Sequence, residues 1–380
     1  MNIDSNTSDL IVRLDAMTYG GDAIGRVEGK AVFVRGGIAG ERVHAKIIED
    51  RGRFARAQMV EVLEASPDRV EPRCPHFGFE DTSCGGCAWQ HLAYAAQLRW
   101  KTEIVREQFR RLGRITNAPV RDSLPSPDVW AYRNHAQFSV TADGRLGFQA
   151  AGSHAVVPIE VCHIVQPPIL EWLQSAGRAQ AGVQRVDVRF PEPHSTIPTY
   201  RVKGVPFCVS AESFFQVNTS LIETLVDLAL ARLELKGGET VLDGYCGAGL
   251  FTRFLAPLAG RVIGVESNPS AVADAHKNLA QFSHIELREG LVESVLATLE
   301  EPVDAAILDP PRAGCGPEVI RQVIARQIRR VVVVSCDPST LARDARQLMD
   351  GGYGLLDVQP LDMFPHTFHI ETISTWVHSS

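Results

Sequence analysis

Two patterns of apolar and polar positions divide the sequence. Between Leu10 and about Ser66, apolar residues alternate with polar ones in short segments separated by glycine turns, as in TYGGDAIGRVEG and GIAGERV. Alternation with a period of two predicts strands with one buried face, and Gly-Gly and Glu-Gly turns favour hairpins. We therefore expect a small antiparallel β-barrel over residues 1–66.

Continuous apolar runs dominate residues 207–380 and alternate with segments of helical spacing. The runs lie in ETVLDGYCGAG, RVIGVE, DAAILDPPRAGC and RRVVVVSCDPS, and a helix is expected around Ser220–Glu234. Continuous apolar runs are typical of parallel strands that are covered on both faces. Their alternation with helices predicts a doubly wound α/β sheet.

Residues 67–206 follow neither pattern. They begin with SPDRVEPRCP, whose prolines and charges are typical of a linker. Residues 90–113 are predicted to be a helix that ends at a glycine and packs on the last domain. Short alternating runs rich in proline fill residues 130–206, and we expect a β-rich central domain.

One face of the predicted helix is basic. RNA binding is one interpretation of this face, but the interleaved Glu103 and Glu107 favour ordinary ion pairs along the helix. The basic residues are Arg99, Lys101, Arg106, Arg110, Arg111 and Arg114.

The cysteines of the central region are spaced as metal ligands. Cys74, Cys84 and Cys87 follow the pattern C-x9-C-x2-C, and Cys162 is the best remaining candidate for a fourth ligand. Four thiolates suit zinc or a [4Fe–4S] cluster, and the spacing does not separate the two. His76 and His91 leave a mixed zinc site as a further alternative.

Length and charge narrow the class of protein. A chain of 380 residues is expected to form two or three domains. The net charge of −7 does not indicate general nucleic-acid binding, although a local basic surface can bind RNA on an acidic protein. The N-terminus is polar and no apolar run is long enough to cross a bilayer, so we expect a cytoplasmic protein without a membrane partner. We also expect a monomer.

Residues with chemical potential follow successive apolar runs. The glycine turn at Gly244, Gly247 and Gly249 is compatible with a bound nucleotide. Glu266 ends the next run about twenty residues later, where an acid meets a ribose in nucleotide-binding folds. Capping of the following helix is the alternative role for Glu266.

Asp309 and Cys336 end two further runs. The carboxyl ends of parallel strands meet at one edge of a sheet, where ligands bind. A thiol at that edge is a candidate nucleophile, and a small packed cysteine is the alternative. No Lys or Arg adjoins Cys336 in the sequence, so any lowering of its pKa must come from the fold or from a bound substrate.

Several motifs resemble, in order, those of the RNA 5-methyluridine methyltransferases: FFQVN, LDGYCGAG, GVE, LDPPRAGC, SCDPSTLARD and DMFPHTFHIE. AIGRVEGKAVFVRGGIAGERV is similar to the TRAM version of the oligonucleotide-binding barrel. With the four cysteines, the resemblance covers nearly the whole chain and is strongest to the iron–sulfur 23S rRNA uracil-5-methyltransferases. It implies a Rossmann-like class I methyltransferase domain, an N-terminal TRAM barrel and a central β-rich iron–sulfur domain.

The resemblance also implies roles for individual residues. Cys336 would be the nucleophile and Glu371 the general base. S-adenosyl-L-methionine would be bound by Gln216, Tyr245, Glu266 and Asp309. A [4Fe–4S] cluster would be held by Cys74, Cys84, Cys87 and Cys162. RNA phosphates would face Arg51, Arg53 and Arg56 of the barrel. Leu250 and Leu291 stand where relatives often carry polar residues.

Uracil chemistry agrees with these roles. Carbon 5 of uracil is a weak nucleophile, and a thiolate added to carbon 6 turns the ring into an enolate that can attack a methyl group. The proton on carbon 5 must then leave, which requires a base. His366 and His369 are alternatives to Glu371 for that base.

We therefore expect a transferase that methylates carbon 5 of a uridine in RNA, with 23S rRNA as the expected substrate. Methylation of tRNA is the alternative within this class. An RNA-binding iron–sulfur protein without catalysis and an electron-transfer or radical enzyme are the alternatives from other classes. Radical enzymes built on S-adenosylmethionine usually use three cysteines, whereas four are available here.

Overall fold

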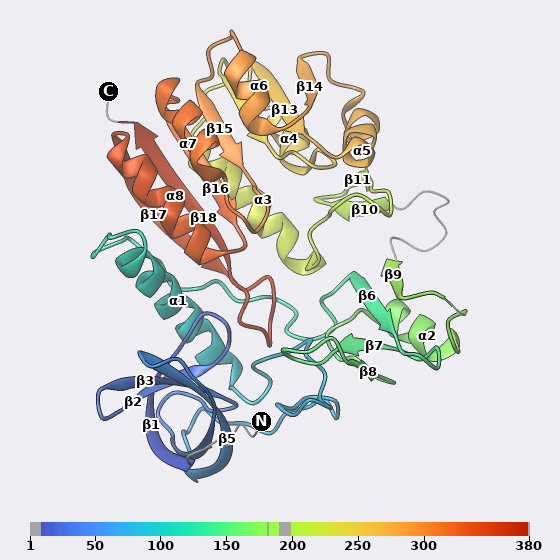
Figure 1. Cartoon of the computed structure of the whole chain (residues 1–380). Coiled ribbons are helices and arrows are strands. Elements are labelled where there is room, and N and C mark those ends of the chain that lie inside the picture. Colours follow the sequence, from blue (N-terminus) through green and yellow to red (C-terminus); the bar gives the residue numbers. More distant parts are fainter. Residues whose placement is uncertain (1–8, 181, 190–198, 379–380) are drawn as a thin grey trace, which may run out of the picture. The chain divides into compact units, whose positions relative to one another are not determined.

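The computed structural model describes residues 9–180, 182–189 and 199–378, which fall into two compact units (Figure 1). Unit 1 consists of Met1–Ile104, Gln137–Val186 and Phe364–His369. Unit 2 consists of Val105–Ala136, Asp187–Met363 and Ile370–Ser380. Each unit thus contains segments that are far apart in the sequence. The domain boundaries expected after residues 66 and 206 remain predictions.

Unit 1 begins with a closed barrel whose strands follow the order β1-β2-β3-β5-β4. Its core contains alternate residues such as Val12, Leu14 and Val43, which are at most 2% exposed. The predicted barrel is confirmed, with the difference that β3 and β5 pair in parallel. The strands are β1 (Asp9–Met17), β2 (Ala23–Val27), β3 (Lys30–Arg35), β4 (Arg42–Asp50) and β5 (Phe54–Glu64).

A buried ion pair ties the barrel to the segment that follows it. Glu41 is fully buried and accepts hydrogen bonds from Arg69, with Nε to Oε1 at 2.5 Å and Nη2 to Oε2 at 2.8 Å. Such a bidentate pair fixes both the position and the orientation of the arginine.

The rest of unit 1 is built from short elements. A four-stranded sheet has the order β8-β7-β6-β9, and only the start of β6 and the end of β9 are assigned to unit 2. Its strands are β6 (His135–Val140), β7 (Leu146–Gln149), β8 (Val156–Pro158) and β9 (Arg185–Arg189). The helix α2 (Pro167–Ser175) was not expected from the proline-rich sequence. Its prolines stand in the first turn, where a missing N–H leaves no helical hydrogen bond unmade.

The helix predicted over residues 90–113 is α1 (Tyr94–Arg111). It begins later than predicted because Leu92 forms a β-bridge with Arg69. The residues of α1 up to Ile104 belong to unit 1 and the remainder to unit 2.

Unit 2 contains a seven-stranded sheet with the order β14-β13-β12-β15-β16-β18-β17. The first five of these strands run parallel, and β18 is antiparallel to both of its neighbours. The doubly wound α/β class is thereby confirmed. The sheet strands are β12 (Thr240–Gly244), β13 (Arg261–Glu266), β14 (Ile285–Glu289), β15 (Ala305–Leu308), β16 (Arg330–Ser335), β17 (Tyr353–Leu361) and β18 (Glu371–His378).

Helices join the parallel strands, and a separate hairpin precedes them. The hairpin is formed by β10 (Thr199–Val202) and β11 (Val205–Cys208). The helices are α3 (Thr219–Leu233), α4 (Leu250–Leu255), α5 (Pro269–Leu279), α6 (Val292–Thr298), α7 (Gly316–Ala325) and α8 (Pro338–Asp350).

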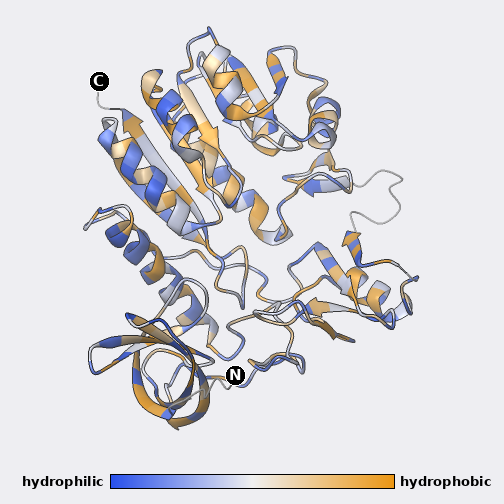
Figure 2. Ribbon diagram, in the orientation of Figure 1, coloured by the Kyte–Doolittle hydropathy of each residue, from blue (hydrophilic) through white to orange (hydrophobic). Residues whose placement is uncertain are grey.

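The central strands of the sheet form the core of unit 2. Every residue of β15 and β16 is buried, and Figure 2 shows the apolar colouring of these strands between helices with polar outer faces. This is the physical reason why both strands appear in the sequence as continuous apolar runs. Among the described residues, no helix is long and apolar enough to span a membrane.

The end of β16 is fixed by the start of α8. The carboxylate of Asp337 accepts hydrogen bonds from the backbone N–H groups of Ser339 and Thr340, at 2.8 and 3.1 Å, and so caps the helix. Pro338 stands in the first turn of α8. Cys336 therefore lies in a short link between a buried strand and a capped helix, at the carboxyl edge of the sheet.

Candidate functional site

Strand pairing in unit 2 brings Cys336 and Glu371 to the same edge of the sheet. β16 and β18 are antiparallel, and Ser335 pairs with Thr372. Continuing this register by one residue places Cys336 opposite Glu371. The hydroxyl of Thr372 donates to the carbonyl of Ser335 at 2.9 Å, which holds the two strand ends together.

Glu371 is a buried carboxyl group, only 2% exposed, at the first position of β18. Its Oε1 has no hydrogen-bond partner among the described residues. Burial, and then the neighbouring Asp309, raise the pKa of Glu371 well above its ordinary value, while Arg312 acts in the opposite direction. A buried acid without a full set of partners is an unusual and costly feature, which is common at functional sites.

Asp309 follows β15 at the same edge and is partly exposed. The amide of Gln216 donates to its Oδ2 at 3.3 Å. Burial, and then the charge of Asp243, raise the pKa of Asp309 to about 7. The structure thus brings four residues of the sequence analysis, Gln216, Asp309, Cys336 and Glu371, to one region of unit 2.

The Cys336 thiol is half-buried in this acidic environment. Burial, and then the charges of Glu371 and Asp309, raise the pKa of Cys336 to about 12, and Arg312 lowers it in part. The fold without a substrate therefore supplies no net lowering of the thiol pKa.

The glycine turn after β12 has the backbone that a close ligand contact requires. Tyr245, Gly247 and Gly249 have positive φ angles of 66°, 55° and 86°. The N–H of Gly247 donates to Oε2 of Glu266 at 3.0 Å. Glu266 also accepts from the N–H of Asn268 at 2.7 Å, so this carboxylate supports the turn and the start of α5 at once.

Two residues at this site were not singled out from the sequence. Asp243 of β12 is fully buried, and it accepts a hydrogen bond from the Thr252 hydroxyl through Oδ2, while Oδ1 has no partner among the described residues. Burial raises the pKa of Asp243 to about 7. Arg312 affects both Cys336 and Glu371. The sequence did contain a signal for each residue. Asp243 is an acid inside an apolar run, and Arg312 directly follows Asp-Pro-Pro.

The four cysteines lie near one another in unit 1. Burial, and then the neighbouring thiols together, raise the pKa of Cys87 to about 12 and that of Cys84 to about 11; Cys162 and Cys74 contribute to both shifts. The N–H of Gly86 points to Cys84 Sγ at 3.4 Å. Among the described residues, however, no three His, Cys, Asp or Glu side chains are arranged as a metal-binding group.

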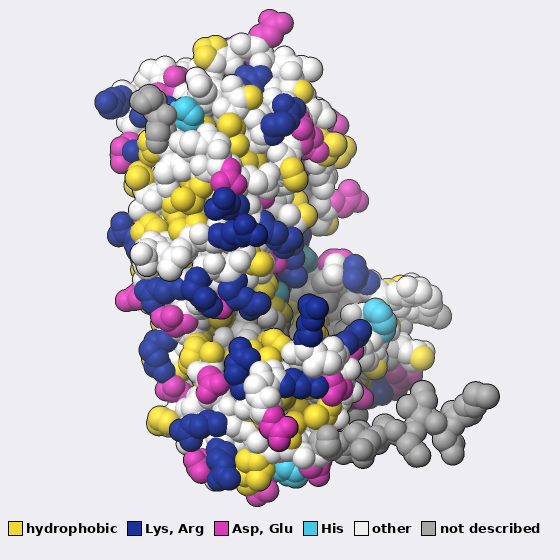
Figure 3. All heavy atoms as spheres, turned by 60° about the vertical axis from the view of Figure 1, so that its left-hand side comes forward, with side chains coloured by type: hydrophobic (Ala, Val, Ile, Leu, Met, Phe, Trp, Pro, Cys, Tyr) yellow, Lys and Arg dark blue, Asp and Glu magenta, His cyan; other side chains and the backbone are white. Residues whose placement is uncertain are grey.

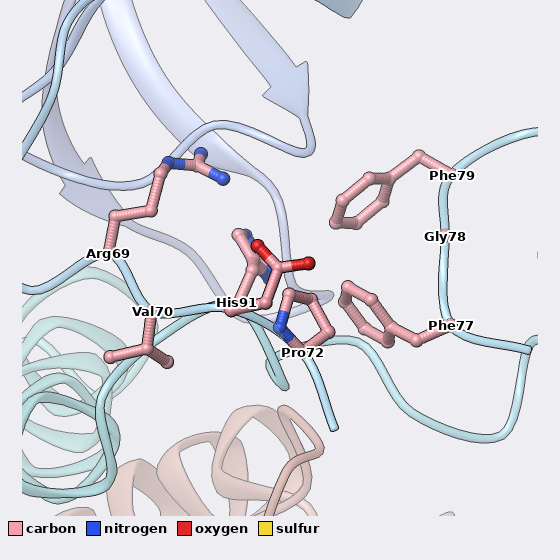
Figure 4. A pocket seen from close by; sticks show the side chains of 8 residues that line it. Arg69, Val70, Pro72, Phe77, Gly78, Phe79 and His91 are labelled. Carbon is pink, nitrogen blue, oxygen red and sulfur yellow. The ribbon is translucent and has the colours of Figure 1, made fainter. Parts of the chain in front are cut away.

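His91 lines a recess of unit 1. The recess has a volume of about 450 Å³, and Figure 4 shows the rings of Phe77 and Phe79 beside His91, with Arg69 on the other side. Ring centroids of His91 and Phe79 are 4.9 Å apart. Burial, and then Arg69, lower the pKa of His91 to about 3. These contacts give His91 a packing role.

Most of the basic residues noted in the sequence have acidic partners. On α1, Glu107 binds Arg110 and Arg111. On the barrel, Arg51 and Arg56 each pair with Glu49. Figure 3 shows Lys and Arg side chains with Asp and Glu side chains among them.

Comparisons with known proteins agree with this architecture. A family model described as TRAM domain matches residues 10–60, and one described as tRNA (Uracil-5-)-methyltransferase matches residues 298–377. An uncharacterised RNA methyltransferase of Streptomyces avermitilis is 36% identical over 96% of each chain. Another, from Halalkalibacterium halodurans, is 32% identical over 97% of each chain.

One solved structure has the same fold over nearly the whole chain. It is the tRNA (uracil-54, C5)-methyltransferase of Pyrococcus abyssi in complex with S-adenosyl-L-homocysteine. Its TM-score is 0.74 with 22% sequence identity, and the match covers 97% of this chain and 99% of that one. At this identity the likeness concerns the fold.

Proposed function

The chain belongs to the RNA uracil-5-methyltransferase family with an N-terminal TRAM domain, and we propose that it methylates carbon 5 of a uridine in RNA through a covalent cysteine adduct. The observation that carries the proposal is the placement of a thiol, Cys336, beside a buried carboxyl, Glu371, at the ligand-binding edge of the sheet. A nucleophile and a base are the two groups that this reaction requires of the protein.

Cys336 acts as the nucleophile in this proposal. Its thiolate adds to carbon 6 of the uracil, and the electron pair of the C5–C6 double bond moves toward carbon 5 and the oxygen on carbon 4. Carbon 5 then takes the methyl group. Because burial and two carboxyl groups oppose ionisation of the thiol, Arg312 has the electrostatic role of favouring the thiolate.

Glu371 then removes the proton from carbon 5. The electrons of that C–H bond restore the C5–C6 double bond, and the bond between carbon 6 and sulfur breaks. A carboxyl with a raised pKa is a stronger base once it is ionised. The unpaired Oε1 is the atom that this proposal assigns to the proton.

S-adenosylmethionine would supply the methyl group on a good leaving group. Glu266, Tyr245, Gln216 and Asp309 are the residues proposed to bind it, with the glycine turn allowing close approach. Glu266 keeps its carboxylate at the end of β13, where a ribose hydroxyl is met in related folds. The hydrogen bond between Gln216 and Asp309 orders both side chains before any ligand binds.

The cysteines Cys74, Cys84, Cys87 and Cys162 are proposed to hold a [4Fe–4S] cluster. The thiolate charges of these neighbouring cysteines would repel one another, so the four form a donor set suited to a cationic centre that neutralises them. The Gly86 N–H near Cys84 Sγ is the kind of donor that stabilises a metal-bound thiolate. Such a group would crosslink residues 74–87 to Cys162. Iron analysis of anaerobically purified protein, and of the Cys87→Ser variant, tests this assignment.

The proposed substrate is 23S rRNA, on the basis of the four cysteines together with the TRAM barrel. The tRNA enzyme from Pyrococcus abyssi shares the fold, so tRNA is the alternative. Methylation of unmodified 23S rRNA and of unmodified tRNA by the purified protein decides between them. Mass spectrometry of rRNA from a deletion strain would then identify the nucleotide.

A mechanism-based trap tests the role of Cys336. RNA that contains 5-fluorouridine should form a stable covalent adduct with the wild-type protein, because fluorine on carbon 5 cannot be removed as a proton. Cys336→Ala should form none, whereas Cys208→Ala, at a cysteine on the β11 hairpin, should behave as the wild type. An adduct with Cys336→Ala would refute the assignment. A wild-type protein that binds RNA without methylating it would support a non-catalytic RNA-binding role.

A further inference from the structure

Three neighbouring strands of the barrel in unit 1 have a well-defined outward side. Strands β2, β3 and β5 lie side by side (Figure 1). Val32 and Val34 of β3 and Ala55 of β5 point into the barrel core and are at most 2% exposed. Because successive side chains of a strand point to opposite faces, the residues between them point outward. These outward residues form the outer face, which consists of Ile24, Arg26, Ala31, Phe33, Arg35, Phe54 and Arg56.

The strand register places aromatic and basic residues next to one another on the outer face. Phe33 of β3 pairs with Arg56 of β5. In the neighbouring row, Ala31 pairs with Phe54 of β5 and with Arg26 of β2. Paired residues point to the same side of a sheet. Phenylalanine rings and arginine side chains are therefore interleaved across three strands, an arrangement that the sequence alone did not indicate.

The rings of Phe33 and Phe54 contact each other edge to face. Their centroids are 5.8 Å apart and the angle between the ring planes is 89°. Both side chains are only partly buried, although the barrel core beneath them is filled by the inward residues. The exposed part of such a ring is a flat apolar surface, and a nucleobase can stack on it.

The charge of the outer face is slightly positive. Its arginines are Arg26, Arg35 and Arg56, and Arg56 pairs with Asp22 at 3.4 Å and with Glu49 at 3.7 Å. Burial raises the pKa of Asp22, and the charges of Arg35 and Arg56 lower it in part. Three arginines beside two acids suit the phosphates of RNA. The excess charge is small, so the aromatic rings are expected to contribute most of the affinity of this face.

We propose that the outer face binds an unpaired stretch of RNA, with bases stacked on Phe33 and Phe54 and phosphates beside Arg26 and Arg56. Proteins that bind single strands combine aromatic stacking with positive charge along the backbone. Because every base has a flat face, stacking tolerates any sequence. The outer face would therefore hold RNA without selecting the nucleotide that is methylated. This inference rests on the function proposed above, in which RNA is the substrate.

Binding of unstructured RNA to the full-length protein tests the inference. The probes are a fluorescent oligocytidine of about 12 nucleotides, a length that one such barrel can cover, and an abasic ribose-phosphate chain of the same length. Neither contains the uracil that would react with Cys336. In fluorescence anisotropy the wild type should bind the oligocytidine more tightly than the abasic chain, because the abasic chain has no base to stack.

Phe33→Leu keeps an apolar side chain and removes the aromatic ring. It should weaken binding of the oligocytidine by about 5- to 150-fold, the range that corresponds to the loss of one stacked base. Binding of the abasic chain should not change. Phe54→Leu repeats the test on the second ring if Phe33→Leu does not fold, and thermal unfolding shows whether each variant is folded.

Two control variants separate stacking from charge and from general apolar contact. Arg26→Met should weaken binding of both probes by the same factor and reduce the dependence of the affinity on salt, because a phosphate contact is lost. Ile11→Ala should bind both probes as the wild type does. Ile11 is an apolar residue of β1 that is 53% exposed and lies outside the outer face.

Wild-type affinity for the oligocytidine in both folded phenylalanine variants would refute the stacking role. An equal loss with both probes would also refute it, because stacking requires a base. A wild-type protein without any preference for the oligocytidine would refute RNA as the occupant and favour a protein partner. Methylation is measured separately. A wild-type protein that does not methylate RNA, but whose phenylalanine variants lose affinity for the oligocytidine alone, would refute the proposed function and support this inference.

Discussion

Replacement of Asp243 by asparagine isolates the cost of burying a charge next to the proposed cofactor turn. Asp243 is fully buried, and its pKa is raised from 3.8 to about 7, chiefly by burial. Asparagine has nearly the same shape and can still accept the hydrogen bond from Thr252. The substitution therefore removes the ionisation and little else.

The sign of the effect follows from proton linkage. Between pH 4 and pH 7 the folded protein keeps a proton on Asp243 that the unfolded chain has lost, so stability falls as the pH rises. The difference of about three pKa units corresponds to roughly 4 kcal/mol at 1.36 kcal/mol for each unit. Below pH 4 this contribution of the protonated Asp243 to the free energy of unfolding is fully present, and above pH 7 it is lost. Asp243→Asn should lack this pH dependence and be the more stable protein at pH 8.

The assay is urea unfolding of the ligand-free wild type and variant at several values between pH 4.5 and pH 8. Titrations that are independent of Asp243 cancel in the difference of their unfolding free energies. The pKa of Asp309, which the charge of Asp243 raises in the wild type, is raised less in the variant and adds to the difference with the same sign. Asp357→Asn is a control of opposite sign. Burial raises the pKa of Asp357, but hydrogen bonds from Thr375 and Arg232 outweigh it and leave the pKa lowered. Asp357→Asn should therefore be less stable than the wild type at pH values above the pKa that Asp357 has in the unfolded chain. A constant difference between wild type and Asp243→Asn across the pH range would refute the reasoning.

Three further predictions concern other parts of the molecule. Glu371→Gln should form the RNA adduct and transfer the methyl group but release product about 10²- to 10⁴-fold more slowly, because general base catalysis is lost; rapid release in a single-turnover assay would assign the base elsewhere. The rate of adduct formation on 5-fluorouridine RNA should rise with pH from 6 to 9, because the pKa of Cys336 is about 12; a flat profile would indicate that the bound substrate sets the ionisation. Arg69→Met should destabilise the barrel by about 3–5 kcal/mol, because it leaves Glu41 buried without its partner, and thermal unfolding alongside Arg53→Met on the exposed barrel surface measures this.

The pattern of apolar and polar residues was sufficient to predict the barrel and the doubly wound sheet, but it did not indicate the helix α2. Alternation in the first strands predicted strands with one buried face. The run of valines in β16 predicted a parallel strand that is buried on both faces. In both cases the pattern of burial determines the order of apolar and polar residues. Chain order also placed Asp309 and Cys336 at one edge, since parallel strands end on the same side. The motif resemblance supplied Glu371 and the cofactor residues.

How these groups affect one another depends on the three-dimensional fold. The antiparallel return of β18 pairs Ser335 with Thr372 and so brings Glu371 to the Cys336 end of β16, a contact between distant segments that no local pattern encodes. Burial then raises the pKa values of Asp243, Cys336 and Glu371 together, because desolvation depends on what surrounds a group and not on its neighbours in sequence. The hydrogen bond from the N–H of His366 to Gln97, on a helix far earlier in the chain, is likewise a contact that no sequence pattern indicated.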